Sequence, residues 1–365
     1  MKYKRKKMWK AWIFFIIFFI SFFSLPIVYT KLFLDGKSNG ATKIIENEEK
    51  LRNIGYSIND ISFIVEDEML LNYTLKNDYD AKILEYAKLE NFNIEKLNDY
   101  YKYENDNKEA NKEDIVKIVN LGINYEYSEK LMNLINQKYF IKENINRYMN
   151  YNNDSLEIVI RNVNCNLDYN FYTNLKKSNL DDGSLILVNK YYYLEKDYEP
   201  SNLVSVDYNY GEGVLTKETY EAFKKLSDAA RSEGLYILSR SPYRSYATQY
   251  TLYNQYKANK GETWADNWSA RAGHSEHQTG LALDVKTYST ANLNDFTYTR
   301  EYQWMKQNAH HYGFILRYPE GKESITGYNA ESWHYRYVGV TAAKVIYDEN
   351  ITFEEYYAYY VKKEA

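Results

Sequence analysis

The spacing of hydrophobic residues divides the C-terminal part of the chain into segments with helical or strand-like periodicity. Residues 216–233 repeat hydrophobic side chains along one helical face and stop at Gly234, which predicts a helix that ends there. Helices are also predicted over 246–260 and 299–312, and two short helices close the chain. Strands are predicted over residues 156–160, 235–239, 281–285, 314–317 and 333–338. Because strands and helices alternate without a regular βαβ rhythm, we expect an α+β fold with a mainly antiparallel sheet and flanking helices over residues 155–365.

Residues 43–153 have a different pattern. This stretch is charged, lacks proline and carries Leu, Ile and Tyr at helical spacing, which predicts an α-helical accessory region. Segments 54–61, 91–97 and 139–145 resemble one another, and intervals of roughly 35–50 residues suit repeated two-helix units. A helical spacer or platform without true repetition is the alternative, and it is the one we favour.

The N-terminus combines a basic cluster with a long apolar segment. Residues 1–10 hold six basic residues and no acid, and residues 11–30 carry no charge over about 20 residues, enough to span a bilayer. No small-residue cleavage site follows, so we expect an uncleaved transmembrane signal anchor rather than a cleaved signal peptide. Residues 31–42 are expected to form a stalk. The positive-inside rule then places residues 1–10 in the cytoplasm and the remainder outside the cell membrane.

Charge and cysteine content narrow the classes of partner. Six of the 46 basic residues lie in the first ten positions, which leaves 40 bases against 50 acids in residues 11–365, a formal net charge of about −10. An acidic body argues against nucleic acid as a partner. The single cysteine, Cys165, excludes an intrachain disulfide and a Cys-rich zinc site, and is expected to be a small core residue.

The chemistry is concentrated in two segments that hold two of the five histidines. His277 and Asp284 lie in Ser-Glu-His-Gln-Thr-Gly-Leu-Ala-Leu-Asp, and Glu331 and His334 lie in Glu-Ser-Trp-His. Two histidines and an aspartate, with a free glutamate, match a catalytic zinc site that has three protein ligands, an open position for water and a base. We therefore expect Zn²⁺ at His277, Asp284 and His334, with Glu331 as the base.

That assignment requires a local irregularity. Strict alternation along a strand from Trp333 would place Glu331 on the face opposite His334. Glu331 reaches an ion held by His334 only if residues 330–332 form a loop or bulge entering the strand, which we predict.

Arg244 lies in a loop after a predicted strand, within Ser-Arg-Ser-Pro-Tyr-Arg-Ser. An exposed guanidinium there can bind a carboxylate or stabilise an oxyanion, and a surface salt bridge is the alternative. A serine hydrolase is disfavoured, because the chain lacks a Gly-x-Ser-x-Gly elbow.

These segments resemble the VanY-type D-alanyl-D-alanine carboxypeptidases and the LdcB-like L,D-carboxypeptidases, zinc peptidases that share a core with lysostaphin-type enzymes and the hedgehog domain. The residues that carry the resemblance are Ser275-x-His277-x-x-Gly280-x-Ala282-x-Asp284, Glu331-x-Trp333-His334-x-Arg336-Tyr337 and Ser241-Pro242-Tyr243-Arg244-Ser245. The likeness covers roughly residues 155–362 and leaves residues 1–150 unexplained. One departure is Pro242, where relatives commonly have glycine.

The resemblance implies roles for individual residues. His277, Asp284 and His334 would bind zinc, and Glu331 would act as general base and acid. Arg244 would bind the substrate or stabilise the transition state, with Ser275 and Gln249 lining the pocket.

The function implied is a membrane-anchored, zinc-dependent carboxypeptidase that removes the C-terminal D-alanine from peptidoglycan stem peptides. D,D- and L,D-specificity both remain open. The alternatives are a peptidoglycan endopeptidase and a non-catalytic wall-binding or scaffold protein.

Overall fold

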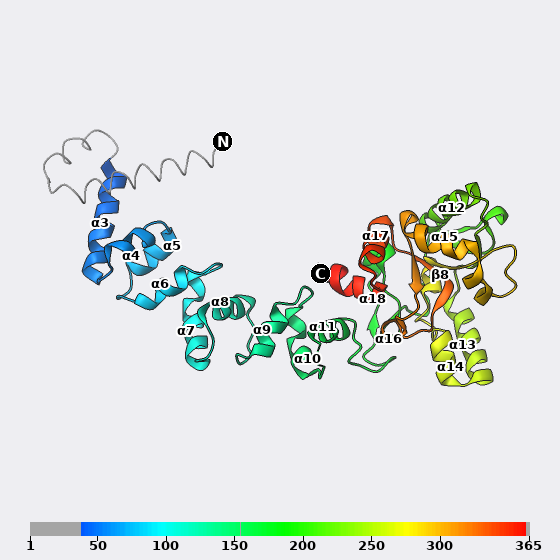
Figure 1. The fold of residues 1–365 in the computed structure, drawn as a ribbon, viewed down its shortest axis with the longest axis horizontal. Helices are drawn as coiled ribbons and strands as arrows, with labels where there is room; N and C mark the ends of the chain where they lie inside the picture. The colour runs from blue at the N-terminus through cyan, green and yellow to red at the C-terminus, as the bar shows by residue number, and fades with distance from the viewer. Residues whose placement is uncertain (1–37, 154, 363–365) are drawn as a thin grey trace. The chain divides into compact units, whose positions relative to one another are not determined.

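The computed structural model describes residues 38–153 and 155–362 (Figure 1). The chain forms two compact units, residues 1–127 and residues 128–365. The expected basic tail, the membrane anchor and residues 31–37 of the stalk lie outside the described residues, whereas residues 38–42 belong to a helix. Among the described residues, no helix combines the length and hydrophobicity needed to cross a membrane.

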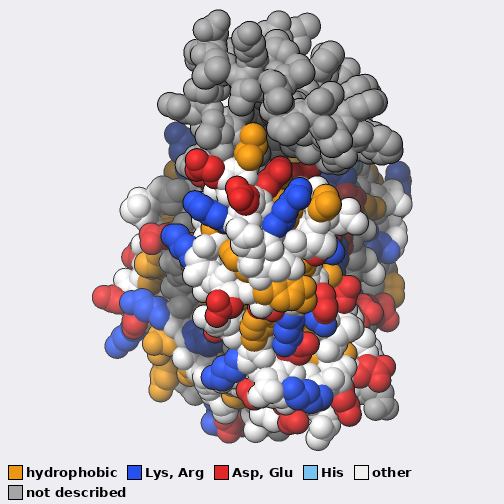
Figure 2. All heavy atoms as spheres, turned by 90° about the vertical axis from the view of Figure 1, so that its left-hand side faces the viewer, with side chains coloured by type: hydrophobic (Ala, Val, Ile, Leu, Met, Phe, Trp, Pro, Cys, Tyr) orange, Lys and Arg blue, Asp and Glu red, His pale blue; other side chains and the backbone are white. Residues whose placement is uncertain are grey.

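Unit 1 is helical throughout its described part. Most of its short helices begin at a Ser, Asp or Asn whose side chain accepts a backbone N–H of the first turn, as Ser57, Asp67 and Asp80 do. Its elements are α3 (Ser38–Ile54), α4 (Ile58–Ile64), α5 (Glu68–Thr74), α6 (Ala81–Ala87), the 3-10 turn η1 (Ile94–Lys96), α7 (Leu97–Asp106) and α8 (Lys112–Leu121). Figure 2 shows acidic and basic side chains interspersed over the face that it displays, with hydrophobic side chains between them. Such a mixed surface does not favour a polyanionic partner.

A tyrosine and an asparagine join helices α7 and α8. The Tyr100 hydroxyl donates to Asn120 Oδ1 over 2.7 Å and accepts from the Asn93 backbone N–H over 3.2 Å. The Asn120 amide in turn donates to the Asn91 carbonyl over 2.7 Å. The pair therefore fixes the turn before α7 as well as the contact between the two helices.

The same arrangement recurs in unit 2. There the Tyr148 hydroxyl donates to Asn164 Oδ1 and accepts from the Ile141 N–H over 3.2 Å. The Asn164 amide donates to the Tyr139 carbonyl over 2.9 Å. The resemblance between segments 91–97 and 139–145 thus corresponds to a repeated helical unit with one hydrogen-bond pattern, whereas the role of a spacer or platform stays a prediction.

Unit 2 begins with the second copy of this helical unit. It comprises α9 (Glu129–Ile135), the 3-10 turn η2 (Lys142–Asn144), α10 (Ile145–Asn150) and α11 (Leu156–Asn164). The strand predicted over 156–160 is wrong, because Ser155 caps a helix there and Val159, Ile160 and Val163 are its buried hydrophobic residues. Cys165 follows this helix and is buried against Ala358 and Tyr359.

The rest of unit 2 is a mixture of helices and small sheets. The central sheet has the order β5-β6-β8-β7 and is antiparallel at every pairing, as the α+β prediction required. Its strands are β5 (Leu238–Ser241), β6 (Ala282–Lys286), β7 (Phe314–Tyr318) and β8 (Glu331–Tyr337). Two small sheets pair β1 (Lys176–Lys177) with β2 (Tyr192–Tyr193) in parallel and β3 (Leu203–Ser205) with β4 (Val214–Thr216) antiparallel. Strand β5 starts three residues later than its prediction, and β8 starts two residues earlier.

The helices predicted over 216–233 and 246–260 are present as α12 (Lys217–Ser232) and α13 (Tyr246–Lys260). The third predicted helix is α15 (Arg300–Asn308) continued by the 3-10 turn η7 (Ala309–Tyr312). The remaining helices and turns are η3 (Leu180–Leu185), η4 (Tyr208–Tyr210), α14 (Glu262–Trp268), η5 (Glu276–Thr279), η6 (Leu293–Tyr298), α16 (Glu323–Thr326), α17 (Val340–Glu349), α18 (Phe353–Tyr356) and the π-helical η8 (Tyr357–Val361).

The two faces of the central sheet differ in chemistry. Helices α12 and α15 lie together in Figure 1, and the main core joins their side chains to Leu283, Val285 and Tyr335 of the sheet. Because side chains alternate along a strand, Asp284 and His334 point to the opposite face. Packing of the core face therefore holds β6 and β8 in place, and the opposite face of these strands carries Asp284 and His334.

Candidate metal and substrate site

Two neighbouring strands bring the first two candidate ligands together. Asp284 of β6 and His334 of β8 are direct partners in the antiparallel register, so their side chains leave the sheet side by side. His277 comes from the turn η5 before β6. Gly280 ends that turn with a φ of +67°, a conformation that favours glycine.

The three side chains converge. His277, Asp284 and His334 each offer a ligand atom, and these atoms lie within 4.8 Å of one another. Asp284 Oδ1 is 3.6 Å from His277 Nε2 and 3.2 Å from His334 Nδ1. This oxygen is buried and has no hydrogen-bond partner within residues 38–153 and 155–362, a deficit that a bound cation would correct. Two imidazoles and one carboxylate are a ligand set typical of catalytic zinc.

The contacts of His277 favour a neutral ring with one nitrogen free to bind a metal. Its Nδ1 lies 2.7 Å from the Pro242 carbonyl, which can only accept, so Nδ1 carries the proton and Nε2 faces Asp284 with a lone pair. Burial and the nearby Arg244 charge lower the pKa of His277 to about 3, which keeps the ring neutral. Pro242, the departure from the relatives, is accommodated by Gly213, since a Cβ there would lie 2.3 Å from the proline ring.

The charges of the site also suit a cation. Burial alone would raise the pKa of Asp284, but His277 and His334 hold it below its ordinary value. Burial likewise opposes a charge on His334, yet Asp284 and Glu276 raise its pKa to about 9. A positive charge is therefore favoured at this position, and a divalent cation would supply it in place of the His334 proton.

Glu331 lies beside the three candidate ligands. Its Oε2 is 3.7 Å from His334 Nδ1, although the two residues are three apart in strand β8. The pairing of β7 with β8 shifts between Leu316 and Tyr318, so that Tyr318 pairs with Glu331. The strand is therefore irregular, as the sequence required, but the shift lies between Glu331 and Tyr335 rather than at residues 330–332, and β8 already begins at Glu331. Burial raises the pKa of Glu331 to about 8, and a cation nearby would lower it.

A cavity of about 440 Å³ opens onto these residues. Arg244, Gln249 and Ser275 all line it, as do the aromatic residues Tyr256, Trp264, Trp268, Tyr318, Tyr328 and Trp333. The Arg244 backbone N–H donates to the His277 carbonyl over 3.1 Å, which ties the arginine loop to the ligand turn. In the described part of the chain, no carboxylate forms an ion pair with the Arg244 guanidinium, which leaves it available to an anionic ligand.

Gln249 and Ser275 are buried at the cavity wall. The Gln249 amide nitrogen donates to Ser269 and Ala270, which fixes the side chain, whereas its buried Oε1 has no partner in the part of the chain that the structure describes. The free oxygen can accept a hydrogen bond from a bound molecule. The structure thus brings together every site residue proposed from the sequence.

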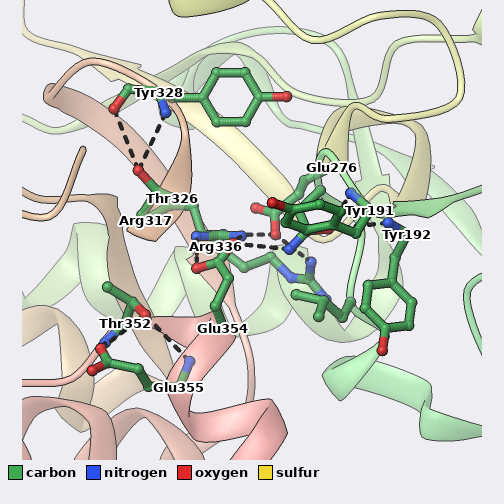
Figure 3. Close-up of polar contacts among 12 residues, drawn as sticks. Tyr191, Tyr192, Glu276, Arg317, Thr326, Tyr328, Arg336, Thr352, Glu354 and Glu355 are labelled. Atoms are coloured by element: carbon green, nitrogen blue, oxygen red, sulfur yellow. Dashed lines mark hydrogen bonds and ion pairs between the residues drawn. The ribbon is translucent and has the colours of Figure 1, made fainter. Parts of the chain in front are cut away.

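A buried ionic network behind the candidate ligands was not predicted from the sequence (Figure 3). Glu276 Oε1 accepts from Arg317 Nε over 2.8 Å and from an Arg336 guanidinium nitrogen over 3.0 Å. Arg317 also pairs with Glu354 of α18 through contacts of 2.9 and 2.6 Å. The sequence contained one indication of this network. Arg317 and Arg336 each stand between apolar or aromatic residues in a strand, and a charge buried in this way needs a partner of opposite charge.

Comparison with known proteins places the chain in a family. The profile described as VanY, D-alanyl-D-alanine carboxypeptidase, matches residues 212–340, a range that contains all the site residues proposed above. The putative carboxypeptidase YodJ of Bacillus subtilis (strain 168) is 45% identical over 184 residues, which cover 48% of this chain and 67% of YodJ. The bifunctional D-Ala-D-Ala dipeptidase and carboxypeptidase VanXYC of Enterococcus gallinarum is 35% identical over 183 residues, or 48% of this chain and 95% of VanXYC. The solved structure of the LdcB LD-carboxypeptidase is 42% identical, with a TM-score of 0.49, and covers 51% of this chain and 91% of that one. The chain therefore belongs to the VanY family of D-alanyl-D-alanine carboxypeptidases and is an enzyme of that family.

Proposed function

We propose that this protein is a zinc-dependent carboxypeptidase that removes the C-terminal D-alanine from peptidoglycan stem peptides. One observation carries the proposal. His277, Asp284 and His334 converge at the wall of a cavity that also holds Glu331 and an arginine with no carboxylate partner among the described residues. The site thus offers a cation position, a base and an anchor for a terminal carboxylate within one pocket.

His277, Asp284 and His334 would hold the zinc ion. When bound, zinc supplies Lewis acidity for the scissile carbonyl and for the attacking water. Glu331 then takes a proton from that water as its oxygen bonds to the carbonyl carbon. It returns the proton to the amine nitrogen of D-alanine as the C–N bond breaks.

Arg244 and the polar residues of the cavity wall would orient the substrate. The guanidinium offers a planar pair of donors to the terminal carboxylate. The free Gln249 Oε1 can accept from a peptide N–H. This preference for a chain end would distinguish a carboxypeptidase from an endopeptidase.

We also propose that residues 11–30 anchor the protein in the cell membrane, with residues 1–10 in the cytoplasm and the catalytic unit outside. The uncharged length and the preceding basic cluster support this orientation. External protease should degrade the catalytic unit on intact spheroplasts and spare an N-terminal tag. Protection of the catalytic unit under those conditions would contradict the orientation.

Incubation of the zinc-loaded protein with muropeptide tetra- and pentapeptides, followed by mass spectrometry, tests the activity. Loss of a single alanine is expected, and the peptide that reacts distinguishes D,D- from L,D-specificity. Cleavage within the stem would instead indicate an endopeptidase. No cleavage with zinc bound would favour a wall-binding role.

A further inference from the structure

We infer that Glu276 is a positioning residue for the metal site: it orients the His334 ring by accepting the Nε2 proton, so that Nδ1 is left free to bind the metal. The inference rests on the proposed function, because it concerns the zinc ion proposed there.

The contacts of Glu276 divide between its two oxygens. Oε1 accepts from Arg317 and Arg336, as Figure 3 shows. Oε2 makes neither of these contacts and lies 3.6 Å from His334 Nε2. Both Oε2 and Nε2 are buried, and neither has a hydrogen-bond partner among the described residues. Two unpartnered polar atoms that face each other in a buried place are suited to one hydrogen bond.

The two ring nitrogens of His334 lie near different carboxylates, and only one of them can carry the proton when the other binds the metal. Nδ1 lies 3.2 Å from Asp284 Oδ1 and 3.7 Å from Glu331 Oε2, so these carboxylates attract a proton to the nitrogen that must bind the metal. A carboxylate at Nε2 draws the proton to the other side of the ring. Glu276 therefore selects the tautomer that leaves a lone pair directed at Asp284 and the cavity.

The arginines fix the carboxylate in its place. Glu276 is 1% exposed, and both guanidinium groups come from strands of the central sheet, β7 and β8. Because His334 belongs to β8 as well, the ion pair between Arg336 and Glu276 ties the acceptor to the strand that carries the histidine.

Glu354 provides a matched control. It is also buried, at 3% exposure, and pairs with the same Arg317, but its contacts are with Arg317 and Asn189 and do not include His334. Glu276→Gln and Glu354→Gln each remove one buried carboxylate from one network, and both should lower the melting temperature. In Glu276→Gln, the amide oxygen can still accept from the arginines, and the amide N–H groups then face His334 Nε2. That arrangement favours the wrong tautomer.

The test is the zinc affinity of the full-length protein, measured by competition with a chromogenic chelator, together with the visible spectrum of the Co²⁺-substituted protein. Glu276→Gln should weaken zinc binding about 10- to 100-fold and change the Co²⁺ spectrum. Glu354→Gln should leave both unchanged. Equal affinities in the two variants would overturn the inference. If either glutamine variant fails to fold, Glu276→Asp and Glu354→Asp provide the same comparison with the charge retained.

The proposed function can fail separately in this experiment. If the wild-type protein binds no zinc, or if zinc still binds after His277→Ala, the proposed metal site is refuted. The role of Glu276 is then refuted as well. Wild-type binding that depends on His277 but is equal in the two glutamine variants would overturn the role of Glu276 alone.

Discussion

The turn that delivers His277 to the site depends on the missing side chain of Gly280. Its φ is +67°, and a Cβ built there would lie 2.9 Å from Leu203 Cδ2 and 3.1 Å from Thr216 Cγ2. The backbone at this position is also held in place, because the Gly280 carbonyl accepts a hydrogen bond from the Thr216 N–H over 3.0 Å. Gly280→Ala should therefore push the turn away from β4 and move His277.

A substitution at a second glycine distinguishes the energetic cost of the left-handed backbone from the cost of steric overlap. Gly234 ends α12 with a φ of +75°, and a Cβ there would meet no atom within 4 Å. Gly234→Ala should cost only the left-handed conformation, about 1–2 kcal/mol. Gly280→Ala should cost this and an overpacking penalty of about 1–3 kcal/mol. The difference of about 1–3 kcal/mol between the variants is the steric part.

Urea unfolding followed by tryptophan fluorescence measures this difference, because four of the six tryptophans, those at 264, 268, 304 and 333, belong to unit 2. The effect on kcat/KM should separate the variants further, since a displaced ligand can reduce the rate about 100-fold. Gly234→Ala should retain nearly full activity. Equal losses of stability and activity in the two alanine variants would refute the reasoning, because the contacts with Leu203 and Thr216 would then not fix the turn.

Three further outcomes are expected. Glu331→Gln should bind zinc like the wild type and lose about 10²- to 10⁴-fold in kcat/KM, and wild-type turnover would refute its role as the base. Arg244→Ala should lower kcat/KM for peptides with a free C-terminal carboxylate and have little effect on a C-terminally amidated analogue; equal effects on both would exclude carboxylate binding. Asn164→Ala should lower the stability of unit 2 by about 2–4 kcal/mol, because its side chain bonds Tyr148, the Tyr139 carbonyl and Asn144. Asn120→Ala should show a smaller loss by circular dichroism, because Asn120 is only partly buried and makes two such bonds, and the reverse order would contradict this account of the repeat.

Local sequence patterns were sufficient to predict an element where the pattern of buried side chains matches the period of that element. The helical period of residues 216–233 predicted α12 closely, and the glycines at 234 and 261 predicted where α12 and α13 end, since these helices stop at Ser232 and Lys260. Alternation along 333–338 identified the face of the strand that carries His334. It also predicted that Glu331 requires an irregular strand.

Where local signals compete, only tertiary contacts decide. The segment Leu-Glu-Ile-Val-Ile after Ser155 has the composition and alternation of a strand, yet it is helical. The hydrogen bonds of Asn164 to Tyr148 and Tyr139 hold it as the second helix of a repeated unit. Propensity over five residues is weak beside such contacts.

The sequence by itself determined which residues make up the candidate site, since His277, Asp284, Glu331 and His334 stand in motifs whose residue types suit one site. The tertiary structure alone decided how that site is held. Glu276 meets arginines from β7 and β8 that are distant in sequence. The free energy of a buried charge depends on partners that the fold brings to it, and a linear pattern does not record them.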